Sequence, residues 1–171
     1  QFLFSTFFDG TGTGEDKAVA VAVDTGNNVY VTGYASMGTN YNYMTIKYDS
    51  NLANPIQMEY IGPGNGDDKP VSIAVNDSLN VYVSGFSYGG PSTGIDYATI
   101  KYNAEGAQQW VQRYNSPANS TDSALAMVLQ GTSALYVTGT SRDSLNSTTV
   151  TYDYKTIKYD AVTGDTIWTA R

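Results

Sequence analysis

The chain repeats itself with a period of about fifty residues, and this feature constrains its fold more than any other. Copies of the motif (Asn/Ala)-(Val/Leu)-Tyr-Val-(Thr/Ser)-Gly begin at residues 28, 80 and 134. Copies of Tyr-x-Thr-Ile-Lys-Tyr-(Asp/Asn) begin at residues 43, 97 and 154. The glycines that close the first motif, Gly33, Gly85 and Gly139, are 52 and 54 residues apart. Self-similarity at this spacing indicates one structural unit used three times.

Each unit is predicted to contain four β-strands joined by turns. In the first strand, large apolar residues alternate with mostly small ones, which is the period-two pattern of a strand. The two motifs form the second and third strands, and a segment with aromatic or aliphatic residues forms the fourth. The first strands are expected at residues 19–23, 71–75 and 125–129, and the fourth strands at residues 4–8, 56–60, 110–114 and 167–171.

Four antiparallel strands in a unit of this length predict the blade of a β-propeller. We therefore expect an all-β fold built of four-stranded antiparallel blades, with no helix longer than about one turn. Val31, Val83 and Val137, in the second strands, are expected to be buried. The expected segments are a single propeller segment over residues 1–171, repeats at approximately 9–60, 61–114 and 115–171, and an outer strand of a preceding blade at residues 1–8.

The predicted blades do not make a closed ring on their own. The sequence opens at Gln1, and its first and last segments are both predicted as fourth strands. Three blades are fewer than the four to eight of known propellers. We therefore expect either a segment of a larger propeller or two or more copies of the chain completing one ring.

The two motifs, the tryptophan in the fourth strands and an aspartate that recurs in every repeat together resemble the bacterial SBBP repeats. This resemblance covers essentially the whole chain. It implies a β-propeller, usually of about seven blades, in a large secreted or cell-surface protein, with no catalytic activity attached to the repeat. This sequence departs from that pattern, because it contains only three sets of first, second and third strands, fewer than a closed ring needs.

Composition excludes several classes of site. The chain has no histidine and no cysteine, so disulfides, imidazole bases and zinc sites built on those residues are absent. Its net charge of −7, without clustered lysine and arginine, argues against nucleic-acid binding. No stretch approaches the roughly 20 apolar residues of a membrane helix. We expect no cofactor and no insertion into a membrane.

The loops that join the second strand to the third differ between repeats, at residues 35–42, 87–95 and 141–151. Variable loops on a regular scaffold are where binding specificity usually resides, although drift at exposed positions explains the same pattern. Tyr41 and Tyr88 are the candidate ligand contacts, because they are not part of the repeat and tyrosine rings stack on sugars or anchor interfaces.

The loops that precede the first strands are rich in glycine and acidic residues. Their oxygens make weak candidates for a calcium site, at Asp9, Glu15, Asp16, Asp67 and Asp68, but the spacing is not that of a dedicated calcium loop. Asp16, Asp68 and Asp122 recur in every repeat. The simpler interpretation gives these three a structural role, capping loop amides in Asx turns. Lys47, Lys101 and Lys158 also recur, and we expect them to extend along the sheet or to pair with a carboxylate.

These observations favour a non-catalytic secreted or cell-surface scaffold that binds protein or glycan through its loop face. One alternative is a carboxylate-based glycosidase or lyase, since propellers host such enzymes. A retaining glycosidase needs two carboxylates about 5–5.5 Å apart, and the sequence singles out no such pair. The other alternative is a structural subunit of an extracellular filament or surface layer. No catalytic residue is predicted.

Overall fold

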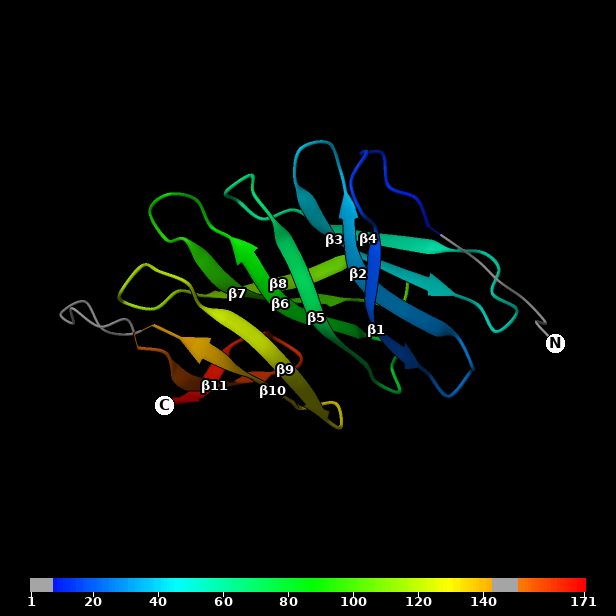
Figure 1. The fold of residues 1–171 in the computed structure, drawn as a ribbon. Helices are drawn as coiled ribbons and strands as arrows, with labels where there is room; N and C mark the ends of the chain where they lie inside the picture. The colour runs from blue at the N-terminus through cyan, green and yellow to red at the C-terminus, as the bar shows by residue number, and fades with distance from the viewer. Residues whose placement is uncertain (1–7, 143–150) are drawn as a thin grey trace.

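A computed structural model of the chain describes residues 8–142 and 151–171. The expected strand at residues 4–8 therefore lies outside the described residues, except for Phe8. The rest is all-β, without a helix in the described ranges, and forms three four-stranded antiparallel sheets (Figure 1). Sheet I contains β1 (Lys17–Val23), β2 (Val29–Ser36), β3 (Tyr41–Tyr48) and β4 (Ile56–Tyr60); sheet II contains β5 (Asp68–Val75), β6 (Val81–Tyr88), β7 (Ile95–Tyr102) and β8 (Gln108–Tyr114); sheet III contains β9 (Ser123–Gln130), β10 (Ala134–Ser141), β11 (Asp153–Asp160) and β12 (Thr166–Ala170).

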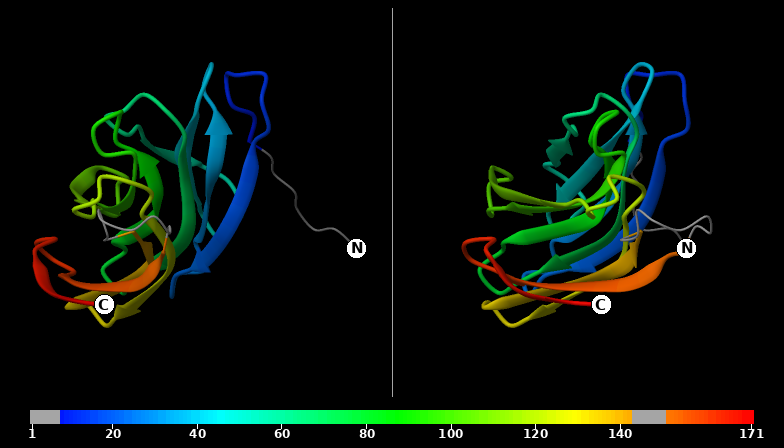
Figure 2. Two further views of the ribbon diagram at one scale, coloured as in Figure 1. Left: turned by 60° about the vertical axis from the view of Figure 1, so that its left-hand side comes forward. Right: turned by 90° about the vertical axis from the view of Figure 1, so that its left-hand side faces the viewer.

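The sheets lie in a row in the order I, II, III. In each sheet the strands follow one another in chain order. The first strand of one sheet packs against the preceding sheet, since β5 contacts β1, β2 and β3 while β9 contacts β5, β6 and β7. Sheets I and III therefore lie at opposite ends of the row (Figure 2). The all-β prediction and the four strands per repeat are confirmed.

A glycine in the second strand of each sheet permits a β-bulge in the first. The pairing of β1 with β2 shifts register next to Gly33, and the same irregularity occurs next to Gly85 and Gly139. A Cβ atom on these glycines would lie 2.0 to 2.3 Å from the carbonyl oxygen of Lys17, Lys69 or Ser123. The repeated glycine is therefore required by the close approach of the bulged strand, which only a residue without a side chain allows.

Each pair of neighbouring sheets buries a core between two chemically different faces. Between sheets I and II, the first sheet contributes mainly aromatic side chains and the second mainly aliphatic ones. The contact between sheets II and III repeats this arrangement. The aromatic contributions are Tyr30, Tyr43 and Tyr60 from sheet I and Tyr82, Tyr97, Trp110 and Tyr114 from sheet II. Each sheet thus has a tyrosine face, which meets the next sheet, and an aliphatic face, which meets the preceding one.

Repeated tyrosines and lysines of the third strand connect one sheet to the next. The Tyr43 hydroxyl donates to the carbonyl of Ala98, and the Tyr97 hydroxyl donates to that of Lys155, both at 3.3 Å. The Nζ atoms of the repeated lysines also reach carbonyls of the following sheet: Lys47 contacts Ala104 at 3.0 Å and Lys101 contacts Val162 at 3.3 Å. Both lysines also lie over a tyrosine of their own sheet. Lys47 and Lys101 therefore join neighbouring sheets, which their expected role did not include.

Burial of the second-strand valines follows their place in the row. Val83 and Val137 are fully buried, as predicted, but Val31 is only half-buried. Val31 lies on the aliphatic face of sheet I, which no other sheet of the described chain covers. Its cross-strand neighbour Val21 is 64% exposed on the same face. The prediction for Val31 was wrong because the burial of this residue depends on whether another sheet covers it. The local sequence pattern gives no information about that.

Candidate functional site at the loop end of the sheets

The loops of interest meet at one end of the sheets. The β2–β3 and β6–β7 loops cover residues 37–40 and 89–94, so they are shorter than predicted because the strands extend further. The segments that precede β1 and β5 lie beside them, since the Gly12 amide donates to the Ser36 carbonyl at 2.8 Å and that of Gly64 donates to Tyr88 at 3.1 Å. We call this region the loop end. Residues 143–150 of the third variable loop lie outside the described residues.

The repeated aspartates connect the two kinds of loop at this end. The Asp16 carboxylate accepts the Gly10 amide at 2.6 Å and the Ser36 amide at 2.8 Å. Asp68 accepts those of Gly62 and Tyr88 at 2.6 and 3.2 Å, and Asp122 accepts those of Ser116 and Arg142 at 2.7 and 3.1 Å. In all three repeats the donors lie six residues before and 20 residues after the aspartate. These contacts differ from the Asx turn expected from the sequence, because they join distant segments.

Burial adds an electrostatic cost at the second of these positions. Asp68 is completely buried, and burial raises its pKa above the ordinary value. Hydrogen bonds from the Gly62 and Tyr88 amides act in the opposite direction, because they stabilise the ionised form. Both carboxylate oxygens are thus occupied by the chain's own backbone. This arrangement suits a structural clamp.

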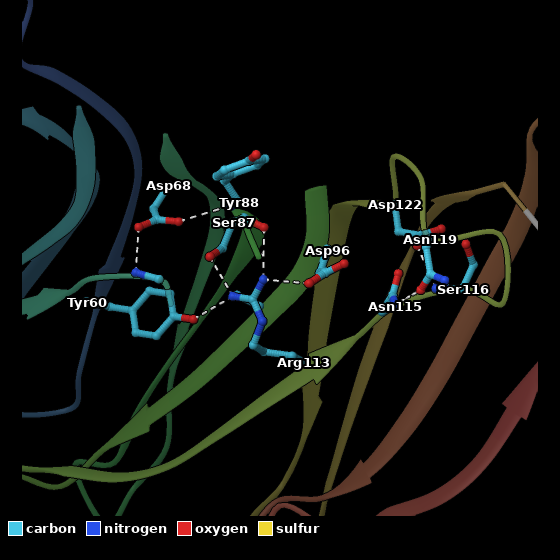
Figure 3. A network of polar contacts seen from close by, with 12 residues as sticks. Tyr60, Asp68, Ser87, Tyr88, Asp96, Arg113, Asn115, Ser116, Asn119 and Asp122 are labelled. Atoms are coloured by element: carbon cyan, nitrogen blue, oxygen red, sulfur yellow. Dashed lines mark hydrogen bonds and ion pairs between the residues drawn. The ribbon is translucent and has the colours of Figure 1, made fainter. Parts of the chain in front are cut away.

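A buried ion pair occupies the loop end of sheet II (Figure 3). Arg113 on β8 contacts Asp96 on β7 at 2.7 Å, and the Asp96 side chain is 3% exposed. The guanidinium also donates to the Tyr60 hydroxyl of sheet I at 2.8 Å, to Ser87 Oγ at 2.6 Å and to the Ser87 carbonyl at 3.0 Å. Burial raises the pKa of Asp96, although the neighbouring arginine acts in the opposite direction. For Arg113, burial lowers the pKa of the guanidinium, but the hydrogen bond to Asp96 raises it, and the net shift of the pKa is upward. The network joins three strands of sheet II to β4 of sheet I, four strands in all.

Sequence reasoning missed this network, although a signal was available. Asp96 is the residue before the repeated Tyr97, and Arg113 is the residue before Tyr114. The same two positions are also in contact in the other sheets. In sheet I, Asn42 donates to Glu59 at 2.7 Å, and in sheet III, Arg171 pairs with Asp153. Comparison of paired positions between repeats, instead of the search for motifs, would have found the contact.

The structure does not gather the acidic residues proposed as calcium ligands. Asp9 is exposed, and Glu15 accepts a hydrogen bond from the Tyr34 hydroxyl at 3.3 Å. Asp67 pairs with Lys69 at 3.3 Å, while Asp16 and Asp68 hold the amides described above. Within residues 8–142 and 151–171, no three acidic side chains come close enough to form a metal site.

Tyr41 lies at the junction of sheets I and II. Its ring makes an edge-to-face contact with Tyr34, with centroids 5.2 Å apart. The ammonium group of Lys69, from sheet II, lies 4.4 Å from the centroid of Tyr41 and 4.9 Å from that of Tyr34. The ring is half-buried and already has a cationic partner in the chain. Only the part of the Tyr41 ring that remains exposed can contact a ligand.

Tyr88 is the second candidate, and it also contributes to packing. A Cβ atom on Gly64 or Gly66 would lie 2.7 or 2.4 Å from Cδ1 of the Tyr88 ring, so the glycines make room for that ring. Tyr88 is half-buried, and its amide is held by Asp68. Tyr41 and Tyr88 lie in different sheets, at the start of β3 and at the end of β6. The exposed positions of the loop end include Thr39, Pro63, Pro91 and Ser92.

Comparison with known proteins does not assign a family. No family model matches the chain, and a search of curated proteins finds no significant match. In the described ranges there is no helix long and apolar enough to cross a membrane.

Proposed function

We propose that the three sheets are consecutive blades of an SBBP-type β-propeller, and that the chain is a non-catalytic secreted or cell-surface scaffold that binds protein or glycan at its loop end. Three features support the blade assignment: four antiparallel strands per repeat, strand order following the chain, and the same third-strand tyrosine bond at both junctions. The extracellular location rests on the resemblance to SBBP repeats.

The observation that supports a binding role is that the carboxylates at the loop end bond to other groups of the chain itself. Five of them are engaged by the chain itself: Asp16, Asp68 and Asp122 by backbone amides, and Asp67 and Asp96 by Lys69 and Arg113. These bonds fix the bases of the loops, while the loop sequences between them differ in every repeat. A rigid frame that carries variable, exposed loops suits recognition better than acid–base chemistry.

A matched pair of serines tests this proposal. Ser92 is exposed in the β6–β7 loop, and Ser78 is exposed in the β5–β6 turn, outside the loop end. Binding would be measured on a panel of immobilised oligosaccharides and, separately, on extracellular matrix proteins. We expect Ser92→Arg to weaken binding about tenfold or more and Ser78→Arg to leave it unchanged, because only the first places a bulky charge at the proposed surface.

Equal effects of the two substitutions, or no binding to either probe, would argue against a loop-end scaffold. The glycosidase or lyase alternative has a different signature. Cleavage of an oligosaccharide that disappears when one acidic residue is replaced would favour an enzyme.

A further inference from the structure

The two outer faces of the row are complementary to each other. The outer face of sheet III has tyrosine character: by register, Tyr136, Trp168 and Val128 point to the same side as Tyr154. Tyr154 is 82% exposed and Val128 is 62% exposed. The outer face of sheet I is aliphatic, with Val21 64% and Val23 56% exposed. These sheets lie at opposite ends of the row (Figure 2).

The same two kinds of face already meet twice inside the chain. At the first junction, the Tyr43 hydroxyl lies 2.8 Å from the position that a Cβ atom of Gly85 would occupy. At the second, the Tyr97 hydroxyl lies at the same distance from that position of Gly139. The glycine therefore forms a seat for the tyrosine of the preceding sheet. Both Tyr43 and Tyr97 are completely buried there, whereas Tyr154, their counterpart in sheet III, is exposed.

Sheet I contains the corresponding seat. Gly33 is the counterpart of Gly85 and Gly139, and it lines a cavity of about 290 Å³. Val31, Met44 and Ile46 line the same cavity. Met44 is the counterpart of Ala98, whose carbonyl accepts the Tyr43 hydroxyl at the first junction. No tyrosine from another sheet of the described chain enters this cavity.

Phe8 supplies one further part of the seat. At the two internal junctions the inserted tyrosine makes an edge-to-face contact with a fourth-strand tyrosine of its own sheet: Tyr43 with Tyr60 at 5.3 Å and Tyr97 with Tyr114 at 5.5 Å. Phe8 is the repeat counterpart of Tyr60 and Tyr114. It lines the Gly33 cavity and packs with Met44 and Ile46. In the proposed contact the receiving copy would supply this aromatic partner through Phe8, whereas at the internal junctions the inserted tyrosine's own sheet supplies it.

We propose that two copies of this chain associate head to tail, with Tyr154 of one copy entering the Gly33 cavity of the other. The contact repeats the geometry of the two internal junctions, so it needs no new kind of interface. Both outer faces are covered when two copies interact reciprocally, which gives a ring of six sheets. That closure rests on the propeller proposal, in which rings contain four to eight blades. The head-to-tail contact itself does not depend on the binding role of the loop end.

Sedimentation velocity and light scattering of the 171-residue chain over a wide concentration range test the contact. We expect a reversible species of twice the 18.4 kDa chain mass. Tyr154→Asp and Val21→Asp should each weaken association about tenfold or more, because each places a charge in an apolar contact. Both residues are exposed in the single chain, so folding should be preserved. The control Ile61→Asp replaces an apolar residue that is 60% exposed in a loop, and it should leave association unchanged.

A mixture of the two variants adds a test of direction. The Tyr154→Asp copy keeps an intact Gly33 cavity, and the Val21→Asp copy keeps an intact Tyr154. The mixture should therefore form a dimer through one intact contact, and associate more strongly than either variant alone. A wild-type chain that stays monomeric, a mixture that does not associate, or an equal loss with Ile61→Asp would overturn the proposal. Open filaments would support the contact and overturn the six-sheet ring.

Discussion

Asp68 shows how a single residue combines two structural demands. It is fully buried, where an unpaired charge is costly, and it accepts the Gly62 amide and shares the Tyr88 amide with the Asp67 carbonyl. The neighbouring Asp67 is exposed and makes one ion pair with Lys69. Two adjacent aspartates are thus expected to contribute very differently to the stability of the fold.

Substitution of these two aspartates should separate their roles. Asp68→Ala removes the acceptor of the Gly62 amide and one of the two acceptors of the Tyr88 amide, and we expect it to lower the free energy of unfolding by about 2–4 kcal/mol. Asp67→Ala removes a surface ion pair and an exposed hydrogen bond from the Tyr41 amide, and it should cost less than about 1 kcal/mol. Urea unfolding monitored by tryptophan fluorescence measures both values. Similar losses for the two variants would contradict the clamp role of Asp68.

Asp24 leads to a prediction about pH. Although burial alone would raise its pKa, hydrogen bonds from Asn28, Gly26 and Tyr30 lower the pKa below the ordinary value of 3.8. The ionised form is therefore favoured by folding, and its contribution to stability is present above the unfolded pKa and lost as pH falls through the folded one. Asn76 is the counterpart of Asp24 in sheet II and accepts the same kind of turn amides, so Asp24→Asn should fold.

We expect Asp24→Asn to be less stable than the wild type by about 1 kcal/mol at neutral pH, since bonds to a charged acceptor are stronger than those to an amide. This difference should shrink as the pH falls below about 4. Unfolding curves of both proteins between pH 3 and pH 7 check the expectation. A difference that stays constant over this range would show that the charge of Asp24 is not involved.

The repeat made the strands predictable, because alternation and turn residues act locally. The strand types, their order and the glycine of the second strand all followed from comparison of the three copies. The contacts between sheets could not be predicted in this way, because they depend on which face of a sheet packs against a neighbouring sheet. Val31 and Val83 occupy equivalent positions, yet only Val83 is buried. The Arg113–Asp96 pair was missed for a related reason, since each partner is unremarkable by itself and only their register on adjacent strands connects them.

The bulge that each sheet builds around its glycine allows a test at the level of the strand pair. In Gly139→Ala, the new Cβ atom would lie 2.0 Å from the Ser123 carbonyl oxygen, so β9 must shift. We expect a loss of about 2 kcal/mol or more in the free energy of unfolding. Gly26→Ala is the control, because its Cβ atom would have no neighbour closer than 3.3 Å. Equal stability of both variants would show that the bulge relaxes freely.

At the scale of the whole molecule, the sheets at the two ends of the row should unfold locally before the middle sheet. Sheet II is covered on both faces: Val81, Tyr82 and Val83 of β6 and Tyr97 and Ile100 of β7 have no exposed surface. Sheet I and sheet III are each covered by another sheet on one face only, and β12 is exposed along its whole length. Since the extensive contacts between sheets of the described residues join neighbours, as in other repeat arrays, local stability should follow position in the row.

Hydrogen exchange followed by mass spectrometry measures this gradient. At low protein concentration we expect the amides of β6 and β7 to exchange most slowly, and those of β1 and β12 at least about tenfold faster, because local opening of an end sheet exposes less apolar surface than opening of the middle one. Raising the concentration should slow exchange in β1, β10 and β11, whose faces would become covered by a second copy, and leave β6 and β7 unchanged. Uniform exchange across the three sheets would instead mean that the row unfolds as one cooperative unit, because the two internal junctions would then be as stable as the sheets they join.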